Sequence, residues 1–132
     1  MQDNTTVKSD EKRAIDALYR ISALAGKNFN PVRALEGILD EVMQVFSANS
    51  ASISLLDASS NTLLIEVQRG LPEKSQGFEL PLGIGITGWV AAHGEALLCP
   101  DVSKEEKYFQ LDERVRAEMA APLTEGGRTV GA

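Results

Sequence analysis

The sequence predicts an α+β domain built on a mostly antiparallel sheet of about six strands. Two stretches with helical periodicity come first, over 11–26 and 31–46. Alternating polar and apolar segments follow, with turn sequences between them, which is typical of strands joined by hairpins. Because 132 residues suffice for one core, we expect a single domain over 11–132, preceded by a disordered polar tail over 1–10.

The two helices are predicted from the spacing of apolar residues. The first carries a stripe of them at helical spacing: Ile15, Leu18, Ile21, Leu24 and Ala25. The second starts at a clear signal, because Asn30 is a good N-cap and Pro31 suits the first helical position. Its apolar residues make one broad face: Leu35, Ile38, Leu39, Val42, Met43, Val45 and Phe46. We expect this face to pack on the sheet.

The strands follow from alternation and turn chemistry. A hairpin is expected from strands over 51–57 and 63–69, joined by a polar turn. In its first strand Ile53 and Leu55 share one face, whereas Ser52, Ser54 and Leu56 share the other. In its second strand the residues Leu63, Ile65 and Val67 are in phase. Further strands are expected over 78–82, 97–99, 119–123 and 128–132, with a short helix over 88–93.

Composition excludes several classes of partner. The formal net charge of −6, with no basic cluster, argues against nucleic acid, because phosphate binding needs a basic surface. We see neither a membrane-spanning apolar run nor a signal peptide, so we expect no membrane partner. Cys99 is the single cysteine, which predicts a reducing, cytoplasmic location. One cysteine and one histidine also argue against a metal site made of protein ligands.

The glycines at 83, 85 and 88 spell G-x-G-x-x-G, which raises the alternative of a dinucleotide site. The surroundings disfavour it. Gly94 ends the following helix too early for a crossover between parallel strands, and Pro81 favours an edge strand. Too few residues follow Asp101 to complete the remaining βαβ units. A tight connection that needs glycine is favoured over a cradle for an anion or carbonyl group at the helix N-terminus.

Several segments, taken in order, resemble the GAF domain family. They are 51–57 (ASISLLD), 85–91 (GITGWVA), 100–102 (PDV), 119–123 (MAAPL) and 127–131 (GRTVG). The resemblance runs from about Ile15 to the last residue. It implies an antiparallel sheet with the terminal helices on one face, and loops and short helices enclosing a small-molecule pocket on the other. The family continues past Gly131 into a last helix, so we expect this chain to lack that helix.

The resemblance implies a bacterial-type regulatory module that senses a small molecule and is not an enzyme. Its output domain would belong to the parent chain: a histidine kinase, a cyclase or phosphodiesterase, or a transcriptional activator. The alternative is a ligand-free dimerisation and scaffolding domain. A redox or dinucleotide-dependent enzyme is a third possibility, although GAF-type sulfoxide reductases use several cysteines. A homodimer is expected through the first helix, and no ligand or cofactor is identified.

Ten residues are candidate ligand contacts, and no catalytic residue is predicted. They are Ser52, Ser54, Phe78, Ile86, Thr87, Gly88, Asp101, Tyr108, Phe109 and Met119. The serine hydroxyls face either the pocket or solvent, and the resemblance favours Ser52 as the contact. The aromatic residues either stack on a ligand or pin their loop to the core, and pinning is favoured.

Three further residues have expected structural roles. Asp101 is expected to cap the next turn rather than to contact a ligand. Cys99 is expected to be a small buried hydrophobe, since apolar residues flank it. His93 is expected at the surface, because no nucleophile accompanies it in the sequence.

Overall fold

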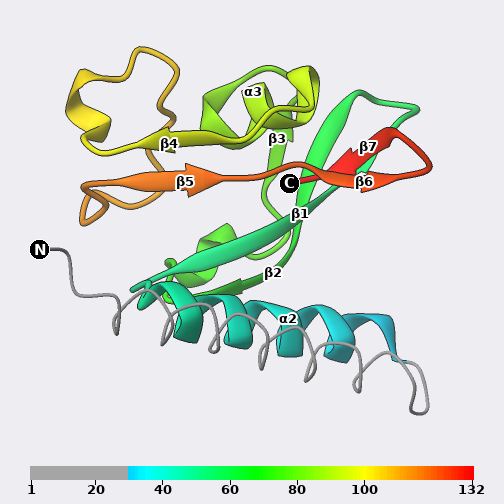
Figure 1. The fold of residues 1–132 in the computed structure, drawn as a ribbon, viewed down its shortest axis with the longest axis horizontal. Helices are drawn as coiled ribbons and strands as arrows, with labels where there is room; N and C mark the ends of the chain where they lie inside the picture. Colours follow the sequence, from blue (N-terminus) through cyan, green and yellow to red (C-terminus); the bar gives the residue numbers. More distant parts are fainter. Residues whose placement is uncertain (1–29) are drawn as a thin grey trace, which may run out of the picture.

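A computed structural model describes residues 30–132 (Figure 1). The predicted tail over 1–10 and the predicted first helix over 11–26 lie outside the described residues. The helices are α2 (Pro31–Phe46) and α3 (Gly85–His93), with 3-10 turns η1 (Glu73–Ser75) and η2 (Val102–Lys104). The strands are β1 (Ala51–Asp57), β2 (Thr62–Arg69), β3 (Glu79–Pro81), β4 (Leu97–Cys99), β5 (Glu118–Ala120), β6 (Leu123–Glu125) and β7 (Arg128–Gly131).

All strand pairs are antiparallel, which confirms the predicted α+β class. One sheet has the order β3-β2-β1-β7-β6, and β4 pairs with β5 in a second sheet of two strands. The single strand predicted over 119–123 is divided into β5 and β6, which follow one another along the same line in Figure 1. The break falls at Ala121 and Pro122, where proline has no N–H to donate to a neighbouring strand.

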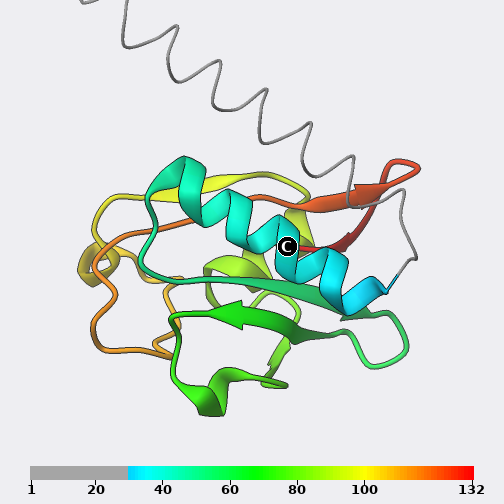
Figure 2. The same ribbon diagram turned by 90° about the horizontal axis from the view of Figure 1, so that it is seen from below.

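Helix α2 forms and packs as its sequence predicts. The Asn30 side chain accepts hydrogen bonds from the backbone N–H groups of Val32 (3.1 Å) and Arg33 (3.3 Å), which caps the helix. Leu39, only 2% exposed, packs against Ile53 of β1 and Val67 of β2. Figure 2 shows α2 lying across these two strands. Leu35, Ile38 and Leu39 of the predicted apolar face therefore bind the helix to the sheet, whereas Val42 and Phe46 of that face are exposed.

A bulge in β2 changes the predicted alternation. Ile53 pairs with Val67, but the next residue, Ser54, pairs with Ile65, so Glu66 has no partner in β1. The extra residue turns Val67 toward α2, whereas Leu63 packs with α3 on the other face. The sequence analysis expected Leu63, Ile65 and Val67 on one face of β2, and this prediction is wrong for Val67. The predicted alternation of β1 is confirmed by the same clusters.

Helix α3 lies on the opposite side of the large sheet from α2 (Figure 1). Its Ala91 packs with Leu63 and Leu80 of the large sheet. Its Ile86 and Val90 pack instead with Cys99 of β4 and with Val102, which begins η2. The helix starts at Gly85, one turn earlier than predicted. It therefore joins the large sheet to the small sheet and to the segment that connects β4 with β5.

The last residues close the sheet beside β1. Ala132 and Ser54 exchange both backbone hydrogen bonds, at 2.8 and 3.0 Å. Gly131 is buried there, and a Cβ atom at this position would overlap the carbonyl oxygen of Ser54. Only glycine therefore allows this approach. Within residues 30–132, no helix combines the length and the apolar character needed to cross a membrane.

Candidate functional site

A half-buried carboxylate lies between α3 and the small sheet. Glu118 pairs with Cys99 across β4 and β5, and Cys99 belongs to the core cluster under α3. The side chain of Glu118 therefore faces α3, where it accepts a hydrogen bond from Thr87 Oγ1 at 3.4 Å. This contact joins residues that are 31 positions apart in the sequence. Thr87, a candidate ligand contact from the sequence, therefore contacts a carboxylate that was not among the candidates.

Electrostatics link Glu118 to Tyr108. Burial raises the pKa of Glu118 above its usual value, and the hydrogen bond from Thr87 offsets part of that rise. The pKa of Tyr108 is also raised, first by burial and then by the charges of Glu118 and Asp112. Glu118 and Tyr108 therefore lie close enough to influence one another. Residues of α3, of β5 and of the segment before β5 thus form one polar centre, which consists of Thr87, Glu118 and Tyr108.

Two phenylalanines meet at the start of α3. The rings of Phe78 and Phe109 are 5.9 Å apart, centroid to centroid, with their planes inclined at 35°. A Cβ atom on Gly85 would lie 3.0 Å from the Cβ of Phe109, so Phe109 covers the first residue of the helix. Tyr108 packs against the core cluster around Ile86. These contacts support the interpretation that the aromatic residues pin their segment to the core.

Backbone hydrogen bonds close the glycine-rich turn over 83–88. Gly83 N–H donates to the carbonyl oxygen of Gly88 (2.9 Å), and Ile84 N–H donates to that of Pro81 (3.1 Å). A Cβ atom at Gly88 would lie 3.1 Å from the Pro81 oxygen and 3.2 Å from the Gly83 nitrogen. This close approach of the backbone explains why a glycine occupies position 88. The amides of Gly83 and Ile84 are occupied within the turn.

The two serines of β1 share the sheet face that looks toward α3. Ser54 lies between Ile53 and Leu55, whose side chains pack on the other face against α2. Ser54 is 2% exposed, so its hydroxyl lies in the interior rather than on a solvated surface. Ser52 is half-buried. Both hydroxyls therefore lie on the α3 side of the sheet, which is also the side of the polar centre.

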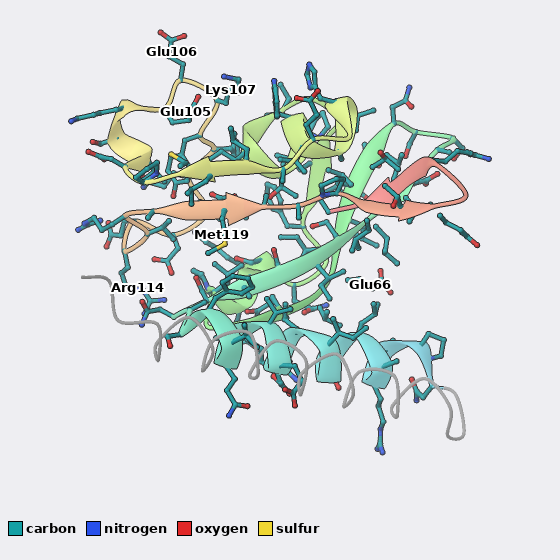
Figure 3. All side chains as sticks on the ribbon, viewed as in Figure 1. Glu66, Glu105, Glu106, Lys107, Arg114 and Met119 are labelled. Carbon is teal, nitrogen blue, oxygen red and sulfur yellow. The ribbon has the colours of Figure 1, made fainter. Side chains whose placement is uncertain are left out.

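Three predicted contacts do not join this centre. Ile86 is 1% exposed and belongs to the core under α3. Asp101 is exposed and caps η2 by accepting from Ser103 N–H (3.0 Å) and Ser103 Oγ (2.6 Å), as expected for a cap. Met119 pairs with Leu98 on the face opposite to Cys99, and Figure 3 shows it on the side of β5 nearer to α2. Met119 is 54% exposed.

The outer side of α3 carries an aromatic stack. The His93 ring lies over the Trp89 ring at 4.2 Å between centroids, and its Nδ1 is 2.8 Å from the Trp89 carbonyl oxygen. Lys107 Nζ lies 5.7 Å from the Trp89 ring centroid. His93 is exposed and Cys99 is 3% exposed, which confirms the expected surface and buried positions. No group of three or more His, Cys, Asp or Glu residues within 30–132 is placed to hold a metal ion.

Sequence reasoning missed Glu118, because the available signal was incomplete. Glu118 and Ala120 stand two residues apart in a strand, so a strand that buries Ala120 must also turn Glu118 inward. The missing information was the register of β5 against β4. A shift by one residue would have turned Met119 toward α3 instead.

Comparisons with known proteins agree with this architecture. A sequence model of the GAF domain matches residues 30–132. The Nif-specific regulatory protein of Enterobacter agglomerans is 26% identical in an alignment of 104 residues that covers 76% of this chain. The match covers 20% of that protein, so the chain spans about a fifth of the length of its curated relative.

Solved structures share the fold at lower identity. The GAF domain of a phosphoenolpyruvate-protein phosphotransferase from Coxiella burnetii superposes with a TM-score of 0.82 at 21% identity, over 91% of this chain and 74% of that one. Free methionine-R-sulfoxide reductase from Neisseria meningitidis, solved with its substrate, gives 0.78 at 20% identity, over 93% and 71%. The fold therefore occurs in an enzyme as well. Because the GAF model covers most of the sequence, this chain belongs to the GAF domain family.

Proposed function

We propose that this chain is the small-molecule-sensing regulatory domain of a larger cytoplasmic signalling protein, and that it is not itself an enzyme. The curated relative is a regulatory protein in which the matching part is one fifth of the length, which supports a role beside an output domain. The observation that carries the sensing role is Glu118, a half-buried carboxylate of β5 that faces α3 and has one hydrogen-bond donor beside it. Buried polar groups of this kind are common where proteins bind ligands.

The sheet offers a route from this centre to α2. Ser52 and Ser54 face the side of α3, while the intervening Ile53 packs against Leu39 of α2. A displacement of β1 by a ligand would therefore alter the packing of α2. Such a change regulates an output domain only if the ligand binds the two arrangements with different affinity.

Native mass spectrometry of the purified chain tests the sensing role. We expect a bound small molecule that is retained by the wild type and lost in Glu118→Gln, which keeps the shape and removes the charge. Glu106→Gln is the matched control, because Glu106 is exposed on the segment that connects β4 with β5 and points away from β5 (Figure 3). A wild type without any bound molecule, after purification from its own source, would contradict the proposal.

A second candidate function is ligand-free dimerisation. Apolar side chains are exposed in pairs on the side of the molecule that carries α2: Leu98 (69%) with Met119 (54%), and Val42 (37%) with Phe46 (55%). Apolar surface of this kind favours association. The stripe of the first predicted helix, outside the described residues, would add to such an interface.

Light scattering distinguishes an interface through that helix from one through the strands. A homodimer formed by the first helix should dissociate in Ile21→Glu/Leu24→Glu and persist in Leu98→Glu. A monomeric wild type at high concentration would contradict dimerisation altogether.

A further inference from the structure

Among residues 30–132, the half-buried carboxylate of Glu118 has no oppositely charged partner. Charged groups inside proteins are paired with opposite charges or satisfied by several hydrogen bonds, because burial without them is costly. Glu118 receives one hydrogen bond, from Thr87, at the long distance of 3.4 Å. No lysine or arginine of residues 30–132 lies within ion-pair distance of its carboxylate. Within residues 30–132, the Glu118 carboxylate is therefore a hydrogen-bond acceptor without a positively charged donor.

Two lysines of the segment that connects β4 with β5 are engaged elsewhere. Lys104 pairs with Asp101 (3.9 Å), and Lys107 pairs with Glu105 (3.3 Å) while lying over the Trp89 ring. Figure 3 shows Lys107 above β4 and Arg114 below β5.

The two arginines that precede β5 have their own partners as well. Arg114 pairs with Asp112 (2.7 Å), and Arg116 donates to the carbonyl oxygens of Glu113 (2.8 Å) and Val115 (3.3 Å). The Tyr108 hydroxyl is directed to the Asp112 carbonyl oxygen at 3.5 Å. The chain itself therefore supplies no cation to Glu118 from this segment.

We propose that the ligand of this site carries a cationic nitrogen group, an ammonium or amidinium on an apolar body, which pairs with the carboxylate of Glu118; this inference rests on the function proposed above. The ligand would supply the donor that the chain withholds, and Thr87 would hold the carboxylate in place. The apolar body would lie toward the ring of Tyr108, which packs against the core cluster around Ile86 and is influenced by the charge of Glu118. An aromatic ring near a carboxylate suits a flat organic cation.

Three probes that share one ring test the charge preference. Benzamidine, benzamide and benzoate present a cationic, a neutral and an anionic group on the same benzene ring. Amide chemical shifts of the isotope-labelled chain are followed during titration with each probe. We expect benzamidine to shift the signals of Thr87 and Glu118 and to bind about tenfold more tightly than benzamide, since a charged hydrogen-bonded pair is worth about that factor. Benzoate should not bind there.

Variants separate a specific pair from general attraction to an acidic protein. Glu118→Gln should bind benzamidine no more tightly than benzamide, and Glu106→Gln should keep the full preference. Retention of the preference in Glu118→Gln, or its loss in Glu106→Gln, would overturn the inference.

Equal binding of the neutral or anionic probe would also overturn the inference, although it would leave a ligand-binding site in place. Failure of all three probes would overturn it too. The function proposed above would then be judged separately, by whether native mass spectrometry finds a retained molecule.

Discussion

Asp112 and Arg114 hold one another in a forked pair within the segment that leads into β5. Arg114 Nη2 donates to Asp112 Oδ2 at 2.7 Å, and its Nε contacts both carboxylate oxygens at 3.0 and 3.1 Å. The Arg114 backbone N–H donates to Asp112 Oδ1 at 2.9 Å. The same guanidinium reaches the Gly70 carbonyl oxygen at 3.3 Å. The segment that carries Tyr108 and Phe109 is thereby tied to the end of β2.

Replacing Asp112 by asparagine should lower stability at neutral pH and remove part of its acid dependence. Arg114 holds the pKa of Asp112 at about 2, below the ordinary value of 3.8. Between these values the unfolded chain binds more protons than the folded one, so stability falls as the pH falls through this window. Urea unfolding at a series of pH values should show this loss in the wild type and less of it in Asp112→Asn.

Glu113→Gln is the control for that experiment, because Glu113 is the exposed neighbour between the two paired residues. It removes one carboxylate without breaking the fork, so its acid dependence should follow the wild type. An Asp112→Asn variant with the unchanged acid profile would show that the pair contributes nothing to folding.

Leu39→Asp should unfold the domain or leave it barely stable. Loss of the packing of this side chain alone is worth about 2–5 kcal/mol, and a buried unpaired carboxylate adds a desolvation penalty. Val32→Asp is the matched control, because Val32 is 45% exposed in the first turn of the same helix, where a negative charge is favourable. Circular dichroism melts should separate the two variants clearly. Similar melting temperatures would refute the assignment of the buried face.

Local signals in the sequence were sufficient for α2 and for β1. The cap at Asn30 and the 3.6-residue spacing around Leu39 need no knowledge of the rest of the chain. The phase of β2 was predicted incorrectly, because the bulge at Glu66 is defined only by pairing with β1. The break at Pro122 had a visible local cause, which the prediction of one strand over 119–123 overlooked.

The candidate site was predicted in parts. Thr87, Tyr108 and the two phenylalanines were selected individually, and the structure brings them to the first turns of α3. Glu118 was missed because its inward orientation depends on β4, a strand about twenty residues away in the sequence. Long-range register of this kind cannot be read from the spacing within a single segment.

Gly88→Ala tests whether this glycine is needed for packing. Alanine favours a helix by about 1 kcal/mol over glycine, but its Cβ would press on backbone atoms of Pro81 and Gly83, and overpacking costs about 1–3 kcal/mol. We expect a net loss of roughly 1 kcal/mol in urea unfolding. Ala92→Gly, on the exposed side of α3, reports the helix propensity alone. A Gly88→Ala variant more stable than the wild type would show that the turn has room for the methyl group.

Glu118→Gln should stabilise the folded chain at neutral pH, in contrast to Asp112→Asn. The pKa of Glu118 is raised above 4.5 in the folded state, mainly because burial disfavours the charged form. The folded chain therefore binds more protons than the unfolded one from pH 4.5 up to the raised value, and stability falls as the pH rises through that window. The advantage of Glu118→Gln over the wild type should be greatest above the window and should shrink as the pH falls toward 4.5. Urea unfolding of both proteins across this range measures the difference, with Glu106→Gln as the exposed control. A stability difference that does not change with pH would mean that the position of the Glu118 carboxylate beside α3 does not disfavour its charged form.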